Sequence, residues 1–263
     1  MMISRFAGGS LDGRTIVITR PARQAHQLAK LIEEVGGRAL QFPVLEIRDP
    51  RDFEPARAAV ARLSEFDLAV FISPTAVERA MALIGGPWPA RLRLAAIGAG
   101  TARALSDQGV TGIIAPDRGG DSEALLVLPE LKAVSGKNIV IFCGEGGREL
   151  LGDTLRARGA EVQRAPCYRR VRPETDPAPL FALWQRNALD AVVVTSSEGL
   201  RNLVAMVGSN GKSLLAATPL FVPHSRIEET GRALGLRRIV LTQSGDQSLF
   251  AELVKWFGEI HYT

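Results

Sequence analysis

The stretch GKNIVIFCGEGGRELLGDTLRARGAEVQRAPCYRRV, residues 136–171, repeats an earlier stretch of the same chain, GRTIVITRPARQAHQLAKLIEEVGGRALQFPVLEIR, residues 13–48. A shift of 123 positions (136 − 13) keeps the apolar runs and the glycines in register. The same shift continues beyond the stretch and places Ser73 on Ser196. We interpret this as a duplicated structural unit. Chance similarity between two generic strand–helix units is the alternative.

Both copies predict the same local structure. A β-rich run at residues 15–19 or 138–142 leads into a helical pattern that ends at glycine. A second extended run follows, and in each copy it carries a proline, Pro43 or Pro166. Proline has no N–H to donate to a β-ladder, so it is expected on edge or isolated strands. We therefore expect these two runs to be exposed connectors between two lobes.

The rest of the chain continues this alternation of strands and helices. We expect a short strand at residues 112–115 and one helix at residues 122–131. Strands that alternate with helices form parallel sheets covered by helices on both faces, which gives an α/β fold. The 263 residues are enough for two domains of about 100–150 residues each.

The composition is that of an ordinary soluble globular protein, with 46% hydrophobic and 23% charged residues. No apolar run approaches the roughly 18 residues of a membrane span, and the start lacks a signal core. The two cysteines have no CxxC spacing, which fits a reducing compartment. We expect a cytoplasmic monomer with no membrane partner. The net charge of +4 is not gathered into a basic stripe with aromatics, so nucleic acid is not expected as a partner.

Several familiar motifs are rejected or weakened by their context. Residues 208–213, GSNGKS, resemble a phosphate-binding loop, but they follow a helix rather than a strand and lack the first glycine. Residues 98–103, GAGTAR, have arginine in place of the third glycine of a dinucleotide fingerprint. No GxSxG elbow or metal-ligand spacing occurs, so we expect neither a nucleophilic serine nor a metal.

The candidate binding site is a set of small, hydroxyl-rich turns that follow the predicted strands. Ligands of open α/β sheets bind beyond the carboxyl ends of the strands. Each turn also leads into a helix N-terminus, whose free N–H groups favour anions. The alternative is that each Ser or Thr merely caps its helix. Taken as a set, the turns predict a site for a polyanion, with candidate binding residues Ser73, Thr75, Gly98, Thr101, Gly144, Ser196, Ser197, His224, Ser225 and Arg226.

Tyr168 breaks the symmetry of the repeat. Its partner in the first copy is Leu45, so the two predicted connectors differ where an aromatic hydroxyl stands beside Cys167 and two arginines. A side chain that packs half-buried on a ladder is the alternative interpretation.

At these residues the sequence resembles the uroporphyrinogen-III synthase family. The matching stretches span most of the chain, and their order and spacing are more specific than any one of them. They are VFISPTAV (70–77), AAIGAGTARAL (95–105), GGDSEALL (119–126), IFCGEGGRELL (141–151), CYRR (167–170) and VVVTSSEGL (192–200). The chain departs from the family at residues 223–226, PHSR, where a Gly-Pro-Thr-Thr-like turn is common.

The resemblance implies two flavodoxin-like lobes with parallel sheets, joined by a two-strand ladder. One lobe would comprise residues 1–40 with residues 171–263, and the other residues 41–170. The pattern of the sequence alone would equally allow a single cut near residue 135.

The resemblance also implies a reaction, the cyclisation of the linear tetrapyrrole hydroxymethylbilane to uroporphyrinogen III. Water is lost, an azafulvene cation forms, and a spiro intermediate inverts the terminal ring, so the enzyme is a hydro-lyase. Electron-rich pyrroles expel the hydroxyl themselves, so no cofactor is expected and the main task is positioning. Tyr168 is the candidate catalytic residue, as the donor of a hydrogen bond to the departing hydroxyl. A non-enzymatic bilobed protein that binds a small anion is the alternative function.

Overall fold

The computed structural model describes residues 11–147 and 149–259, and the chain folds as two compact units. Unit 1 comprises Met1–Glu46 and Val171–Thr263, and unit 2 comprises Ile47–Arg170. The first crossing between units therefore follows Glu46, six residues beyond the boundary expected at residue 40 (46 − 40).

Unit 1 is built on a parallel sheet with the strand order of flavodoxin. In this sheet the order is β10-β9-β8-β1-β2, and every pairing is parallel. Counted along the chain, this is the order 2-1-3-4-5 of a doubly wound fold. The strands are β1 (Thr15–Ile18), β2 (Arg38–Gln41), β8 (Ala191–Val193), β9 (Leu220–Val222) and β10 (Ile239–Leu241).

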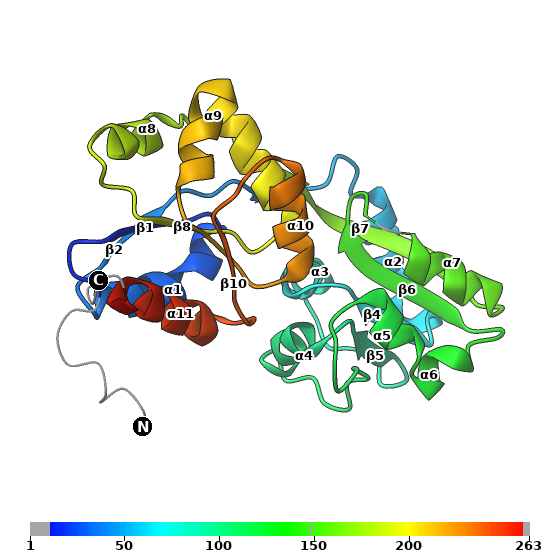
Figure 1. The fold of residues 1–263 in the computed structure, drawn as a ribbon. Coiled ribbons are helices and arrows are strands. Elements are labelled where there is room, and N and C mark those ends of the chain that lie inside the picture. The colour runs from blue at the N-terminus through cyan, green and yellow to red at the C-terminus, as the bar shows by residue number, and fades with distance from the viewer. Residues whose placement is uncertain (1–10, 148, 260–263) are drawn as a thin grey trace. The chain divides into compact units, whose positions relative to one another are not determined.

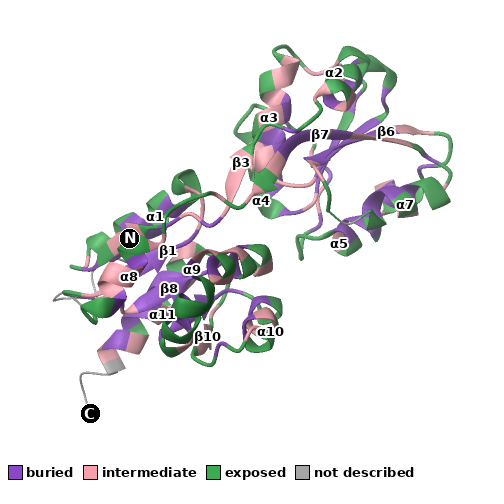
Figure 2. Cartoon of the chain, turned by 90° about the horizontal axis from the view of Figure 1, so that it is seen from above, coloured by how far each residue is buried: buried purple, intermediate pink, exposed green. Residues whose placement is uncertain are grey.

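Helices cover both faces of this sheet (Figure 1). The helices of one face are α1 (Ala22–Glu33) and α11 (Asp246–Glu259). Those of the other face are α8 (Ala178–Gln185), α9 (Ser197–Ala217) and α10 (Ser225–Ala233). Figure 2 shows β1 and β8 buried beneath helices whose outer faces are exposed. Within the described ranges, no helix is both long and apolar enough to cross a membrane.

Unit 2 repeats this architecture. Its sheet has the order β3-β7-β6-β4-β5, and an isolated parallel bridge from Ala95 to Ile114 takes the place of a further strand beside β5. Ile114 thus forms a single bridge where a strand was expected at residues 112–115. The strands are β3 (Glu46–Arg48), β4 (Leu68–Phe71), β5 (Arg93–Ala96), β6 (Asn138–Gly144) and β7 (Glu161–Val171).

The helices of unit 2 also form two layers. One layer contains α2 (Glu54–Ala61), the 3-10 helix η1 (Leu63–Glu65), α3 (Pro74–Ile84) and α4 (Ala99–Ser106). The other contains α5 (Ser122–Leu126), α6 (Pro129–Lys132) and α7 (Leu150–Ala157). The single helix expected at residues 122–131 is broken because Leu128 precedes Pro129 and adopts an extended conformation, with ψ 141°.

The duplication is confirmed by matching hydrogen bonds in the two sheets. The N–H of Thr15 donates to Asp190 over 2.8 Å, and the N–H of Asn138, its repeat partner, donates to Asp67 over 2.8 Å. Each sheet therefore pairs the first strand of one copy with the later strands of the other. The strands at the two crossings, β3 and β7, are neighbours in one sheet, so the predicted two-lobed α/β fold with a connecting ladder is confirmed.

The proline prediction is confirmed in one copy and wrong in the other. Pro43 lies between β2 and β3, which are edge strands of their sheets. Pro166 instead lies within β7, an inner strand between β3 and β6. It is tolerated there because a β-bulge interrupts the ladder next to it.

Candidate active site

The strand order of each sheet reverses at one place, and ligands of such folds bind at the carboxyl ends beside that reversal. In unit 2 the reversal lies between β6, which ends at Gly144, and β4, which leads to Ser73. In unit 1 it lies between β1, which leads to Arg20, and β8, which leads to Ser196. The fold thus gathers residues predicted from distant parts of the sequence at one edge of each sheet.

Tyr168 is placed in unit 2 by the β-bulge in β7. Cys143 is in register with Pro166 but Gly144 with Tyr168, so Cys167 is an extra residue on β7. Pro166 lacks the N–H that a regular ladder would use, which favours the interruption at this point. The bulge turns Cys167 and Tyr168 toward the same core, where they are 0% and 1% exposed.

The hydroxyl of Tyr168 belongs to a chain of hydrogen-bonding groups. It lies 3.0 Å from Oγ of Ser73, the N-cap residue of α3, and that Oγ accepts from the N–H of Ala76 over 3.0 Å. Nη2 of Arg170 donates to the Tyr168 oxygen over 3.4 Å, and the guanidinium carbon lies 5.8 Å from the centroid of the ring. The structure therefore joins the predicted residues Tyr168 and Ser73 and adds Arg170, which the sequence shows only as part of CYRR.

The other predicted residues of unit 2 lie beside these hydrogen-bonded groups. Thr75 is half-buried in the first turn of α3. Gly98 is the N-cap residue of α4, and a Cβ there would stand 2.7 Å from Cα of Gly120, so close packing of two turns requires the glycine. Thr101, in the first turn of α4, is 3% exposed. Gly98 and Thr101 thus follow β5, next to β4.

In unit 1 the two adjacent serines differ in their partners. Oγ of Ser196, the N-cap residue of α9, accepts from the N–H of Gly199 over 3.0 Å, and the residue is exposed. Ser197 donates to the carbonyl of Arg226 over 3.3 Å and accepts from Thr230 over 3.0 Å. Ser197 therefore ties α9 to α10, and Thr230, which the sequence did not indicate, completes that tie.

The PHSR turn leads into α10; its proline is buried, and the three residues after the proline are exposed. His224 is its N-cap residue, and its Nε2 lies 3.2 Å from Oγ of Ser244, which follows β10. Ser225 and Arg226 occupy the first turn of the helix with exposed side chains. The three residues therefore present polar groups at the carboxyl edge of the sheet, and Ser244 joins them from a turn that the sequence did not indicate.

Arg20 is a further residue at the carboxyl edge of unit 1. Its Nη1 donates to Asp246, the first residue of α11, over 2.7 Å, and the two side chains are 15% and 18% exposed. Nε and Nη2 of Arg20 are buried without a hydrogen-bond partner in the part of the chain that the structure describes.

Both cysteines, Cys143 on β6 and Cys167 on β7, lie next to the hydrogen-bonded groups around Tyr168. Burial raises the pKa of the Cys167 thiol to about 12, and the neighbouring Cys143 adds to the effect. Burial also raises the pKa of Cys143, although Arg164 opposes the shift. Thiols with raised pKa are inert as nucleophiles at neutral pH, which leaves them a packing role.

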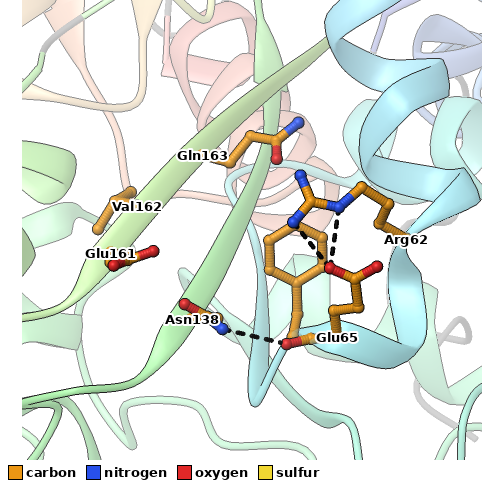
Figure 3. Close-up of a pocket in the computed structure, with 7 residues that line it drawn as sticks. Arg62, Glu65, Asn138, Glu161, Val162 and Gln163 are labelled. Atoms are coloured by element: carbon orange, nitrogen blue, oxygen red, sulfur yellow. Dashed lines mark hydrogen bonds and ion pairs between the residues drawn. The ribbon is translucent and has the colours of Figure 1, made fainter.

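A polar hollow of about 210 Å³ lies away from these residues, near the amino ends of β6 and β7 (Figure 3). Its rim carries the Arg62–Glu65 ion pair, in which Nε and Nη2 of Arg62 donate to one carboxylate oxygen over 2.9 and 2.7 Å. The hydrogen bond and the charge of Glu65 raise the pKa of Arg62, and the hydrogen bond from Arg62 lowers the pKa of Glu65. The pair is exposed, and the guanidinium and the carboxylate are each other's hydrogen-bond partners.

A more open hollow of about 590 Å³ lies beside β3 and β7. Arg79 pairs with the carboxylate of Asp49 over 3.1 Å, and Nε of Arg169 donates to the carbonyl of Asp49 over 3.0 Å. Neither hollow is lined by a predicted site residue. The candidate site therefore remains at the carboxyl edges of the two sheets.

Comparison with known proteins places this fold and these residues in one family. A family model described as uroporphyrinogen-III synthase HemD matches residues 26–251. The uroporphyrinogen-III synthase of Salmonella typhimurium is 36% identical over 236 residues, which cover 88% of this chain and 96% of the relative. The Escherichia coli synthase is 34% identical over the same length and the same shares.

Solved structures agree on the fold. A mutant uroporphyrinogen III synthase from Thermus thermophilus matches with a TM-score of 0.63 and 20% identity, covering 95% of this chain and 100% of that one. The synthetase from Helicobacter pylori 26695 matches with a TM-score of 0.57 and 13% identity, covering 92% and 99%.

Proposed function

The chain belongs to the uroporphyrinogen-III synthase family, and we propose how its residues carry out the family's reaction. The chain is a lyase that cyclises hydroxymethylbilane to uroporphyrinogen III with loss of water. The alternative of a non-enzymatic anion-binding protein has no support among the relatives described above, which are named as synthases.

In our proposal Tyr168 supplies the proton with which the hydroxyl of the substrate leaves as water. The observation that supports this is the chain of Arg170, Tyr168 and Ser73 at the strand reversal of unit 2. A phenol is a mild general acid, which suffices because the electron-rich pyrrole expels the hydroxyl largely by itself. The reaction then needs no cofactor, and positioning supplies most of the catalysis.

The carboxylates of the substrate are bound, in this proposal, by the turns that begin the helices. Main-chain N–H groups at helix N-termini favour negative charge, and hydroxyls beside them add hydrogen bonds. In unit 2 the turns are those of Ser73 with Thr75, before α3, and of Gly98, before α4, whereas the side chain of Thr101 is too enclosed, at 3% exposure, to add a hydrogen bond to the substrate. In unit 1 they precede α9 and α10, and the exposed residues are Ser196, His224, Ser225 and Arg226.

We also propose that one chain acts alone, because strands of both sequence copies complete each sheet within the same chain. The two cysteines are unpaired thiols, which fits a cytoplasmic location.

The experiment that tests the proposed function follows the product isomers. Hydroxymethylbilane is generated immediately before use and incubated with and without the purified protein, and the type III and type I products are separated. We expect type III product only with the protein. Wild-type protein that binds hydroxymethylbilane yet leaves only type I product would show a binding protein instead. Tyr168→Phe should lower the rate of type III formation about 10²-fold, the low end for acid–base assistance.

A further inference from the structure

We propose that Ser73 is the group that protonates the leaving hydroxyl, and that Tyr168 acts behind it by replacing the proton that Ser73 gives up. This inference rests on the proposed function, in which Tyr168 is the source of the proton. It assigns to Ser73 a catalytic role beyond the binding of a carboxylate, and it assigns to Arg170 a positioning role.

Tyr168 is too deeply buried to meet a substrate directly. The side chain of Tyr168 is 1% exposed and is among the largest fully buried side chains of the chain. A group so enclosed has no surface on which to meet the hydroxyl of a substrate. Ser73, whose Oγ lies 3.0 Å from the tyrosine oxygen, is half-buried and stands at the carboxyl edge of the sheet. Of the two hydroxyls, only that of Ser73 is placed to meet a ligand.

The hydrogen bonds of Ser73 leave its own proton available to a ligand. A serine hydroxyl has one proton and two lone pairs. One lone pair of Ser73 accepts from the N–H of Ala76 over 3.0 Å. The buried proton of Tyr168 needs an acceptor, and the acceptor found for it among the described residues is the other lone pair of Ser73. With both lone pairs of Ser73 occupied in this way, its own proton is not used by these two partners and is available to a ligand.

Arg170, Tyr168 and Ser73 form a polarised series of hydrogen bonds. Nη2 of Arg170 donates to the Tyr168 oxygen over 3.4 Å. The tyrosine hydroxyl thus accepts from Arg170 and donates to Ser73, and the serine hydroxyl accepts from Tyr168 and donates to the ligand. Hydrogen bonds arranged in this sense polarise one another and make the last proton easier to transfer. Negative charge that develops on Ser73 also lies at the N-terminus of α3, a helix of 11 residues, which favours it.

In the proposed step, one proton passes from the protein to the leaving hydroxyl and is later returned. The C–O bond of the hydroxymethyl group breaks, and its electron pair leaves with the oxygen, which takes the proton of Ser73 and departs as water. The lone pair of the adjacent pyrrole nitrogen forms the new double bonds of the azafulvene cation. Ser73 takes the proton of Tyr168 at the same time, and Arg170 faces the resulting negative charge. The proton released when the macrocycle closes returns through Ser73 to Tyr168, so one water is formed and the protein is restored.

The other sequence copy provides an internal comparison. Ser196, the repeat partner of Ser73, caps α9 with the same 3.0 Å bond from a backbone N–H. The repeat partner of Tyr168, however, is Leu45, which has no hydroxyl. The same capping serine is therefore backed by a proton donor only in unit 2, and a capping role alone does not account for the tyrosine.

Single-turnover rates with fresh hydroxymethylbilane test the relay through five variants. Ser73→Ala and Tyr168→Phe should each lower the rate of type III formation about 10²-fold. The double variant should lose no more than either single one, because both changes break the same relay. Ser73→Gly should show the same kinetic loss while preserving most of the cap, because glycine is a good N-cap residue. Ser73→Thr should retain activity within a few-fold, because its hydroxyl can pass the proton on.

The control for capping is Asp121→Ala. Asp121 caps α5 by accepting from the N–H of Ala124 over 2.9 Å, so this change lowers stability without touching the relay. Thermal unfolding of all variants separates loss of folded protein from loss of rate. We expect Asp121→Ala to lower the melting temperature and to leave the rate per folded molecule unchanged.

The outcomes distinguish the role of Tyr168 as the source of the proton from the relay of that proton through Ser73. A normal rate in Ser73→Ala with a low rate in Tyr168→Phe would overturn the relay and leave Tyr168 as a direct donor. A normal rate in Tyr168→Phe would overturn the role of Tyr168 itself. Losses that multiply in the double variant would show two independent groups and would also overturn the relay.

Rates in mixtures of H₂O and D₂O give a readout that a structural role would not change. Two protons that move together predict a curved dependence of the rate on the deuterium fraction in the wild type. The residual rate of Ser73→Gly should depend on it linearly. A linear dependence in the wild type would contradict the relay.

Discussion

Gly144 and Tyr168 are in such close contact that the glycine can carry no side chain. A Cβ built on Gly144 would stand 2.9 Å from both Cε2 and Cζ of the tyrosine ring, and 3.3 Å from its oxygen. The ring therefore lies against the backbone of β6, opposite the bulge that places it. This contact fixes the position of the phenol and gives the glycine a role other than the binding of substrate.

The first prediction is that Gly144→Ala displaces the ring of Tyr168 and slows the reaction. Overpacking should lower the free energy of unfolding by about 1–3 kcal/mol. In a Tyr168→Ala background the same change should cost little, because the clashing ring is gone. A thermodynamic cycle from urea unfolding measures this coupling. Gly86→Ala is the control, since the nearest atom to a Cβ there is 3.8 Å away. Equal costs of Gly144→Ala in both backgrounds would contradict the assignment.

The second prediction separates the adjacent serines of unit 1. Ser197 already donates to Arg226 and accepts from Thr230, so Ser197→Ala should mainly lower stability, by about 0.5–1.5 kcal/mol. Ser196 is exposed and its proton is available to a carboxylate, so Ser196→Ala should raise KM a few-fold. Neither change should abolish turnover, because the substrate is bound by many groups. Loss of turnover in a folded Ser196→Ala protein would show a catalytic serine instead.

The repeat in the sequence was sufficient to predict much of the fold. Its register of 123 positions reappears in the paired hydrogen bonds from Thr15 to Asp190 and from Asn138 to Asp67. It failed where one residue changed the backbone locally. Pro166 is tolerated on an inner strand because the extra residue Cys167 interrupts the ladder beside it, and no periodicity reveals a bulge of one residue.

The candidate site was predictable only in part. Ser73 was indicated by its place after a strand, and Tyr168 by the broken repeat. Their contact was not predictable, because 95 positions separate the two residues. Thr230 could not be predicted as a site residue, because nothing in the sequence of a helix shows that one of its threonines bonds to a residue on another helix. Such contacts depend on packing between elements, which sequence spacing does not record.

The third prediction concerns alkaline pH and the buried thiol of Cys167. Its pKa rises from 9.0 to about 12 in the folded chain because burial disfavours the thiolate. The folded state then binds the proton more tightly than the unfolded state. Stability from this group is present below pH 9 and is lost as the pH rises from 9 towards 12, with a slope of at most about 1.4 kcal/mol per pH unit.

Unfolding by urea between about pH 8 and 11 measures this loss. Cys167→Ala should be less stable at about pH 8 but should show a shallower decline above about pH 9. Cys143 remains in the variant and contributes its own decline, since burial raises its pKa as well. Identical slopes in the variant and the wild type would contradict the prediction.

The last prediction concerns the ion pair of Arg20 and Asp246 at the carboxyl edge of unit 1. The pair is 2.7 Å long and largely buried, yet Nε and Nη2 of Arg20 are without a partner in the described residues. Asp246→Asn would leave a buried guanidinium uncompensated, which costs about 3–5 kcal/mol when such a pair is fully buried and less at 15% exposure. Adding Arg20→Met removes the unpaired charge and two unsatisfied donors. The double variant should therefore be more stable than Asp246→Asn alone, although it lacks both charges. Urea unfolding of the cycle measures this, and Glu228→Gln, which breaks the exposed pair with Arg232, should cost no more than about 1 kcal/mol. A double variant less stable than Asp246→Asn would mean that Arg20 stabilises the edge through contacts other than this carboxylate.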